Sequence, residues 1–161
     1  MKADSGRVSR PGEGRGAVPG AIELIARGVL TREGCLLLCR SLTRGHAYLP
    51  GGHVEFAEPA KVALAREMQE ELGTTVEVGE FLGAVEHAFR DQDGAHAELN
   101  LLFRLRGEIR EPRAREPDIA FFWAPLAELG SSGLLPRALA NLLPRWLEDP
   151  SPSRFATSTD A

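Results

Sequence analysis

The chain has 161 residues, of which 43% are hydrophobic and 26% are charged, which indicates one folded domain with a hydrophobic core and argues against a disordered acidic protein. Nineteen Lys and Arg residues against 23 Asp and Glu residues leave a net charge of −4, so the chain lacks the overall positive field that draws proteins to nucleic-acid polymers. No apolar run reaches the roughly 18 residues of a membrane span, and the first residues lack the apolar core of a secretion signal, so we expect a cytoplasmic protein that does not bind membranes.

Composition divides the chain into three parts. Residues 1–20 are rich in Gly, Arg, Ser and Pro and are expected to form a disordered N-terminal tail. Residues 149–161 contain few large apolar side chains and are expected to form a flexible C-terminal tail. The region between them, residues 21–148, has the usual size of a single domain.

The domain begins with two segments that favour strands. Ala21–Leu30 is compatible with a strand, residues 31–34 have the composition of a turn, and Cys35–Arg40 is a second apolar run, so we expect the two segments to pair. Gly45–Gly52 contains too much Gly and Pro for regular structure and is predicted to be a loop.

Both cysteines of the chain lie in the second apolar run. Cys35 and Cys39 are four residues apart, which places them on one face of a strand. We interpret them as small hydrophobic side chains in a reducing compartment. A zinc site or a disulfide is the alternative.

A helix is predicted over Pro59–Leu72, since proline suits a first helical turn and the following Gly73 suits a C-cap. At 100° per residue, Glu67, Glu70 and Glu71 fall within an arc of about 100°, beside an apolar stripe that can pack on a sheet. Neighbouring like charges destabilise a helix by about 0.2–0.5 kcal/mol per pair, whereas hard Mg²⁺ or Mn²⁺ ions take oxygen ligands. The acidic face therefore indicates a cation site, with a solvated helix face as the alternative.

The second half of the domain predicts a hairpin, a short strand and a terminal helix. Val76–Ala88 and Leu99–Arg106 are strand candidates, joined by a turn-like segment at residues 90–94. Ile119–Ala124 is a short aromatic strand candidate. Pro136–Leu147 is predicted to be helical, with a break or a fresh start at its second proline.

Two glycines and two carboxylates precede the predicted helix. Gly51 and Gly52 lack a Cβ, so the backbone there can approach a ligand and present its carbonyls and amides. Glu55 and Glu58 follow within the same loop. This arrangement strengthens the prediction of a bound cation.

The spacing of these residues resembles a known family signature. Gly52, five residues, Glu58, seven residues and then the run Arg66–Gly73 match the Nudix box Gly-x5-Glu-x7-Arg-Glu-U-x-Glu-Glu-x-Gly-U, where U is bulky and apolar. All seven literal positions are present. The chain departs from the pattern at Thr74, the last apolar position, and at Ala57, where the family often has glycine.

The resemblance implies an α/β (α+β) fold of the Nudix type, an α/β/α sandwich with a mixed central β-sheet. It also implies a pyrophosphohydrolase that acts on phosphoric anhydride bonds, in which water attacks a phosphorus of a nucleoside diphosphate linked to a further group. Mg²⁺ or Mn²⁺ would neutralise the diphosphate. A non-catalytic sensor that binds a nucleotide or metal through the same fold is the alternative.

The resemblance further implies roles for single residues. The expected metal ligands are Glu67, Glu70, Glu71 and the carbonyl of Gly51 or Gly52, and the expected catalytic residues are Glu67, Glu70 and Arg66. Arg66 is expected to hold the carboxylates, and Glu58 to fix the loop to the helix; Gly51, Glu55, Glu58 and Gly73 are expected to build the motif.

The identity of the general base and of the substrate contacts is less constrained. Glu67 is the first candidate base, and Glu98 and Glu116 are the alternatives, each of which is otherwise an ordinary exposed acid. The candidate substrate-binding residues are Arg27, Arg40, Arg44, His46 and Tyr48. His53, His87 and His96 lack metal-type spacing and receive no role.

Residues beyond the box narrow the substrate only a little. The markers that the family associates with ADP-ribose, dinucleoside polyphosphates and NADH are absent. The expected partner is therefore a small nucleotide, such as a nucleoside di- or triphosphate, and a homodimer is compatible with the sequence.

Overall fold

The computed structural model describes residues 21–149 and 154–160. The predicted N-terminal tail, residues 1–20, lies outside the described residues. Along the chain the elements are β1 (Ile22–Val29), β2 (Thr31–Arg32), β3 (Cys35–Ser41), β4 (Ala47–Tyr48), β5 (Gly51–His53), α1 (Ala60–Leu72), β6 (Glu77–Asp91), β7 (Gly94–Arg106), β8 (Ile119–Pro125), the 3₁₀ helix η1 (Leu126–Ser131), α2 (Leu139–Glu148) and β9 (Phe155–Asp160).

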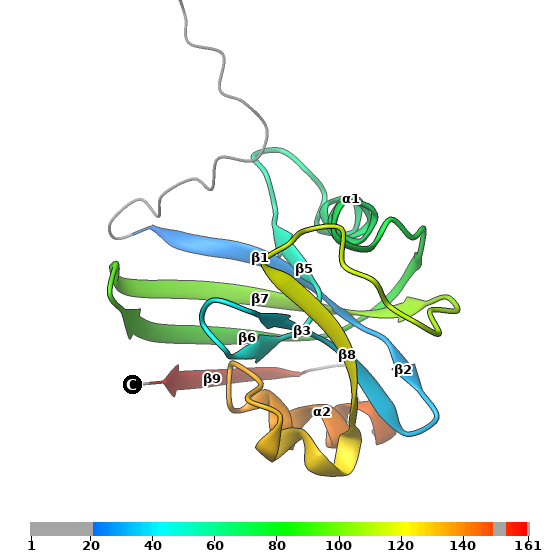
Figure 1. Ribbon diagram of the computed structural model, residues 1–161. Coiled ribbons are helices and arrows are strands. Elements are labelled where there is room, and N and C mark those ends of the chain that lie inside the picture. Colours follow the sequence, from blue (N-terminus) through cyan, green and yellow to red (C-terminus); the bar gives the residue numbers. More distant parts are fainter. Residues whose placement is uncertain (1–20, 150–153, 161) are drawn as a thin grey trace, which may run out of the picture.

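The strands form two sheets (Figure 1). The larger sheet has the order β5-β1-β7-β6-β9 and is mixed, because β1 runs parallel to β7 and β6 parallel to β9 while the other pairs are antiparallel. In the smaller sheet, β3 pairs in antiparallel fashion with β2, β4 and β8. The predicted mixed α+β architecture is therefore confirmed.

Helices cover the strands on opposite sides, with α1 and α2 separated by the sheets in Figure 1. Strand β3 explains this layering, because successive side chains of a strand point to opposite faces. Leu36 and Leu38 pack with Leu139 and Leu143 of α2 in one core cluster. Leu37 packs in a second cluster, with α1. A strand buried on both faces has a continuous apolar sequence, as β3 does.

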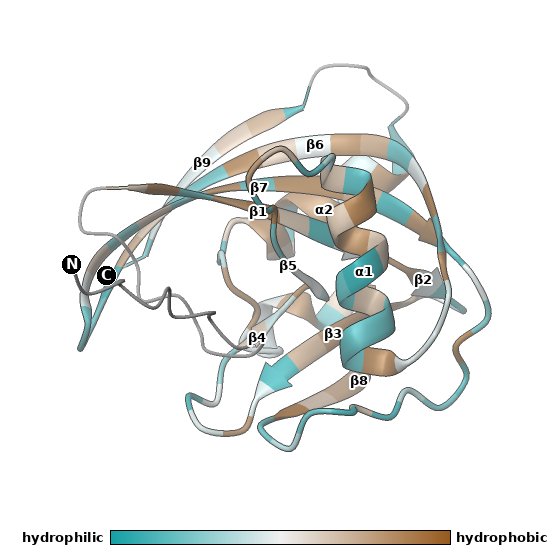
Figure 2. Cartoon of the chain, turned by 90° about the horizontal axis from the view of Figure 1, so that it is seen from above, coloured by the Kyte–Doolittle hydropathy of each residue, from teal (hydrophilic) through white to brown (hydrophobic). Residues whose placement is uncertain are grey.

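Helix α1 positions the candidate acidic face. It runs over Ala60–Leu72, one residue shorter than predicted because Pro59 is its N-cap, and it ends as predicted at Gly73, which is in the left-handed conformation with φ 65°. Leu64, Met68 and Leu72 are buried, and hydrophobic and hydrophilic residues alternate along the helix in Figure 2. Glu70 is exposed and Glu67 is partly buried, whereas Glu71 is buried together with the apolar stripe.

The predicted pairing of the first two strands is wrong. The β1 strand joins the larger sheet and β3 the smaller one, because β1 finds partners in β5 and β7. The predicted turn at residues 31–34 is reduced to Glu33 and Gly34, since Thr31 and Arg32 pair with β3. The predicted loop Gly45–Gly52 also contains β4 and the start of β5.

The predicted hairpin is confirmed, and its strands are longer than expected. β6 and β7 pair as far as Asp91 and Gly94. The predicted β8 strand is confirmed. The terminal helix starts three residues later than predicted, at Leu139, and continues through Pro144 without a break.

The C-terminal segment corrects another expectation. Residues 155–160, which we expected within a flexible tail, form β9 and pair in parallel with β6 from Ala84 to Phe89. The polar sequence of β9 does not predict a strand, and its backbone hydrogen bonds with β6 explain why it forms one.

The two cysteines are free thiols, so the disulfide alternative is not realised. Cys39 is buried and Cys35 is partly exposed. Burial raises the pKa of the Cys39 thiol to about 12. Within the described residues, no helix is long and apolar enough to cross a membrane.

Candidate active site

The guanidinium of Arg66 lies at the centre of the acidic face. Its Nε and Nη2 donate to the two carboxylate oxygens of Glu58, both at 3.1 Å. Its Nη1 donates to Glu67 at 2.8 Å and to Glu70 at 3.2 Å, and Nη2 also donates to the carbonyl of His53 at 3.2 Å. These bonds lower the pKa of Glu58 and tie the loop before α1 to the helix.

Gly52 lies directly against the Glu67 carboxylate. A Cβ at Gly52 would come within 2.7 Å of both Glu67 oxygens, so only glycine permits this approach. Burial raises the pKa of Glu67, although the hydrogen bond from Arg66 acts in the opposite direction. The glycine thus lets a partly buried carboxylate lie close to the loop backbone.

Glu71 is the most enclosed carboxylate of the cluster, with 8% of its surface exposed. Burial raises its pKa to about 8, although the positive charge of Arg27 and a hydrogen bond from the Gly51 backbone oppose the change. One oxygen, Oε2, is buried without a hydrogen-bond partner. A buried oxygen of this kind needs a proton or a cation as its partner.

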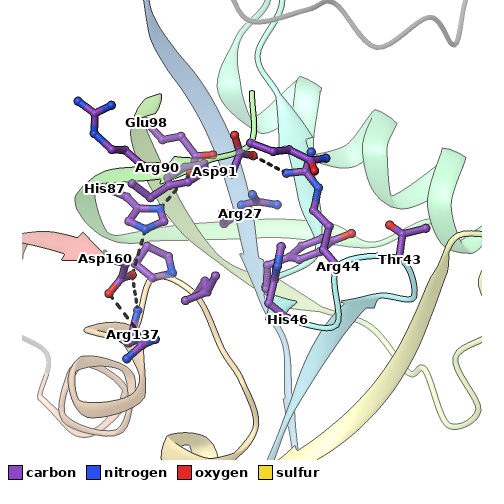
Figure 3. A pocket seen from close by; sticks show the side chains of 15 residues that line it. Arg27, Thr43, Arg44, His46, His87, Arg90, Asp91, Glu98, Arg137 and Asp160 are labelled. Atoms are coloured by element: carbon purple, nitrogen blue, oxygen red, sulfur yellow. Dashed lines mark hydrogen bonds and ion pairs between the residues drawn. The ribbon is translucent and has the colours of Figure 1, made fainter. Parts of the chain in front are cut away.

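A cavity of about 590 Å³ lies between β1, β4, the β6–β7 hairpin and β9 (Figure 3). Its lining combines cationic, acidic and aromatic side chains from distant parts of the sequence, namely Arg27, Thr43, Arg44, His46, Tyr48, His87, Phe89, Arg90, Asp91, Gln92, Glu98, Leu135, Pro136, Arg137 and Asp160. The volume suits a nucleotide-sized ligand.

Arg27 connects the cavity with the loop before α1. Its Nη1 donates to the carbonyls of Leu49 and Gly51, both at 3.1 Å. Its Nε donates to Asn100 at 3.3 Å, and the guanidinium lies 5.2 Å from the centre of the Tyr48 ring. The positively charged side chain of Arg27 therefore contacts both the loop before α1 and the cavity.

The family follows from a comparison with known domains. A family model described as NUDIX domain matches residues 23–148. The chain belongs to the Nudix family. The predicted family membership is thereby confirmed, and the protein is a Nudix hydrolase.

Individual relatives agree with this assignment. A MutT-like protein of Streptomyces ambofaciens is 42% identical over 64 residues, which are 39% of this chain and 42% of that protein. The MutT Nudix hydrolase of Burkholderia pseudomallei is 28% identical, with a TM-score of 0.60 over 81% of this chain and 99% of its own. The MutT protein of Methanosarcina mazei, at 22% identity, covers 82% and 97% of the two chains with a TM-score of 0.66 and shares the fold.

Four of the five predicted substrate-binding residues of this Nudix hydrolase line the cavity, and one does not. Arg27, Arg44, His46 and Tyr48 line the cavity. Arg40 does not, since its Nη2 donates to the Ser132 carbonyl at 3.1 Å and its guanidinium stacks 4.7 Å from the centre of the Phe122 ring. These contacts hold Arg40 outside the cavity lining, and its predicted contact with the substrate stays a prediction.

The two alternative bases lie at different ends of the site. Glu98 lines the cavity; burial alone would raise its pKa, but hydrogen bonds from His87 and Asn100 and the charge of Arg27 leave the pKa lowered. Glu116 is exposed and follows Arg115, whose backbone N–H donates to the Glu71 carbonyl at 2.8 Å. Glu116 is thus near the carboxylate cluster, and Glu98 is in the cavity.

Two predicted motif residues shape the backbone around α1. The Glu55 backbone N–H donates to Glu58 at 3.1 Å. A Cβ at Gly73 would collide with the Arg115 guanidinium. Ala57, where the family often has glycine, adopts a positive φ of 62°, which accounts for the family preference at this position.

Sequence reasoning missed several residues of the cavity wall. His87, which received no role, lies between Glu98 and Asp160, and Arg137 approaches Asp160. No motif marks these positions, and Asp160 belongs to the segment expected to be a tail. Alternation along the β6–β7 hairpin offered the one available signal, because His87 pairs directly with Glu98.

No three His, Cys, Asp or Glu side chains are grouped for metal binding anywhere in residues 21–149 and 154–160. Glu58, Glu67 and Glu70 each form an ion pair with Arg66 instead of converging on one point. The donor set nevertheless fits a hard cation, because it consists of carboxylate oxygens with one buried oxygen lacking a partner. Nudix hydrolases generally depend on a divalent metal.

Proposed function

We propose that this Nudix hydrolase cleaves the pyrophosphate linkage of a nucleoside di- or triphosphate derivative with the help of Mg²⁺ or Mn²⁺. The observation that carries the proposal is the buried Glu71 carboxylate, whose Oε2 lacks a partner and which interacts with the positive charge of Arg27, an arginine of the cavity lining. A metal cation bound by the acidic cluster would neutralise the carboxylates and attract an anionic diphosphate, and the arginines would pair with the diphosphate.

The residues that would hold the cation are Glu67, Glu70, Glu71 and the carbonyl of Gly52. When bound, the cation would polarise a phosphoryl oxygen and neutralise the diphosphate. Arg66 shares its Nη1 between Glu67 and Glu70, so it holds two mutually repelling carboxylates in place before a cation arrives. Its role is therefore to position ligands.

Glu67 is the proposed general base. Arg66 binds its Oε1 at 2.8 Å, which orients the carboxylate and leaves Oε2 to accept a proton. Water attacks phosphorus, the new P–O bond replaces the bridging anhydride P–O bond, and the water proton passes to Glu67. Since burial raises the pKa of Glu67, its carboxylate is a better proton acceptor than a fully solvated one.

The cavity is the proposed site of the nucleoside portion. Arg44 forms ion pairs with Asp91 at 2.9 Å and with Asp93 at 3.4 Å, which join the loop before β4 to the β6–β7 hairpin turn. Tyr48 provides an aromatic ring in the lining, and aromatic faces suit a flat base, whereas the Phe89 ring is already stacked with His87 and His96. Burial lowers the pKa of His46, so a neutral imidazole faces the ligand at pH 7.

The test is hydrolysis of a nucleotide panel with Mg²⁺ or Mn²⁺, with products separated by chromatography. Water labelled with ¹⁸O identifies the phosphorus that is attacked. We expect Glu70→Gln and Glu71→Gln to lower kcat by orders of magnitude, while Glu128→Gln, an exposed acid on η1, retains wild-type turnover. Saturable nucleotide binding without product under all conditions would instead support the non-catalytic sensor.

A further inference from the structure

Strand β9 brings a carboxylate from the end of the described chain into the cavity wall. β9 pairs with β6 so that His87 stands opposite Ser158, and Phe89 opposite Asp160. Asp160 Oδ2 lies 3.0 Å from His87 Nε2 and accepts a hydrogen bond from the Arg137 backbone N–H at 3.1 Å. Its side chain is 12% exposed. Asp160 therefore fastens β6 and the segment before α2 to one point.

His87 transmits this contact across the sheet. Its side chain is 4% exposed, and its other ring nitrogen, Nδ1, lies 3.5 Å from Glu98 Oε2. The Phe89 ring stacks on the imidazole at 4.8 Å with an angle of 23°. Both ring nitrogens face a carboxylate oxygen, each contact being a hydrogen bond when that nitrogen carries a proton, and Phe89 covers one face, so the ring can turn only by losing a contact.

Glu98 is the last residue in this series of contacts, and it lines the cavity. Its Oε2 is near His87 and also accepts from Asn100 Nδ2 at 3.2 Å. Its Oε1 accepts no hydrogen bond from any part of the chain that the structure describes. One oxygen of Glu98 is thus fixed by the protein, and Glu98 itself belongs to the cavity lining, where a ligand can supply a donor to the other (Figure 3).

We propose that Asp160 is a positioning residue for substrate selection, which acts through His87 to aim the free Glu98 oxygen at a hydrogen-bond donor of the nucleoside. The inference rests on the proposed function, because it assigns the nucleoside to the cavity. An ionised carboxylate can only accept hydrogen bonds. The donor is therefore a base N–H or a ribose hydroxyl, and pockets that bind such a donor discriminate strongly against analogues without it.

The first test separates positioning from folding. Asp160→Ala is expected to raise KM about tenfold, the effect of one lost hydrogen bond to a charged group, and to change kcat less than about twofold. Asp160→Asn keeps an acceptor oxygen and is expected to lie between wild type and Asp160→Ala. Thr157→Ala is the matched control, because it removes an exposed β9–β6 hydrogen bond, from Thr157 to Glu86 at 3.1 Å, and should leave KM unchanged.

The second test asks whether the effect passes through Glu98. Glu98→Gln is expected to raise KM as well, and Asp160→Ala in that background should add little, because residues that act through one contact are not additive. GTP compared with ITP reports the base 2-amino group, and GTP compared with dGTP reports the ribose hydroxyl. The discrimination lost in Asp160→Ala identifies the donor. Additive KM effects, or an unchanged KM with a lower kcat, would overturn the proposal.

An independent readout separates failure of this inference from failure of the proposed function. In ¹⁵N-labelled protein without nucleotide, the His87 ring signals should shift in Asp160→Ala and remain unchanged in Thr157→Ala. If the wild type hydrolyses no nucleotide, the proposed function fails, and GTP affinity from calorimetry takes the place of KM. Unchanged His87 signals together with unchanged affinity in Asp160→Ala would exclude the positioning role.

Discussion

Replacing Gly52 with alanine places a methyl group against the Glu67 carboxylate. The added Cβ would lie 2.5 Å from the carboxyl carbon of Glu67 and 2.7 Å from both of its oxygens, whereas ordinary contacts begin at 3.4 Å, so the carboxylate must move away by about 0.9 Å. Retreat is possible because the obstructing atoms are the far end of a flexible side chain. The fold is therefore expected to tolerate the change, while the 2.8 Å bond between Glu67 and Arg66 is distorted.

Misplacement of a reacting group by 1 Å can reduce the rate on the order of 10²-fold. We therefore expect kcat of Gly52→Ala to fall by somewhat less than about 10²-fold, which corresponds to a barrier increase of about 2 kcal/mol. The free energy of unfolding should change by less than about 1 kcal/mol. Steady-state kinetics with the best nucleotide of the panel and urea denaturation measure the two quantities.

Gly130→Ala provides the matched control, because a Cβ there has no neighbour within 4 Å. It adds the same methyl group outside the site and should retain wild-type kcat. If Gly52→Ala keeps more than half of the wild-type kcat, the close approach of the loop to Glu67 has no catalytic consequence. A large loss of stability would show instead that the obstruction acts on the fold.

Three further predictions concern the carboxylate cluster, the thiols and the loop before α1. Because burial raises the pKa of Glu71 to about 8, above its unfolded value of about 4.5, the folded state binds the extra proton and stability should fall as pH rises between these values; urea denaturation in EDTA should show this fall in wild type and not in Glu71→Gln. Native protein at pH 8 should be alkylated at the partly exposed Cys35 and spared at Cys39, whose pKa is raised to about 12 by burial, as read by peptide mass spectrometry; equal labelling would contradict the described burial. Ala57→Gly should stabilise the protein by up to about 1 kcal/mol, because alanine is strained at φ 62°, and a lower denaturation midpoint would show that this strain is absent.

The sequence predicted the elements whose ends are marked by residues within or next to the element itself. Helix α1 was predicted because Pro59 and Gly73 mark its ends and its apolar stripe has helical spacing. The β6–β7 hairpin was predicted for a similar reason, since its turn lies between two apolar alternating segments. Elements of this kind need no information about distant partners.

Elements that depend on a partner could not be predicted. Strand β9 has the polar sequence FATSTD and is ordered by pairing with β6. Gly51 and Gly52 are poor strand formers that pair with Arg27 and Ala26 of β1. The strand pair expected between β1 and β3 failed because each strand has better partners elsewhere in the chain.

The same distinction between local and distant contacts applies to the candidate site. The spacing within residues 52–73 predicted the set of acids around Arg66, because a loop and one helix place them together. The cavity wall joins residues 73 positions apart, as in the contact between His87 and Asp160, and no spacing rule reaches that far. The same limit explains Arg40, whose neighbours Ser132 and Phe122 come from distant segments.

Arg27 has a consequence for how ligands influence one another. The same guanidinium holds the Leu49 and Gly51 carbonyls and faces the Tyr48 ring in the cavity. A ligand that moves this group at one end changes the free energy of binding at the other. Thermodynamic reciprocity then requires that the factor by which a cation tightens nucleotide binding equals the factor by which the nucleotide tightens cation binding.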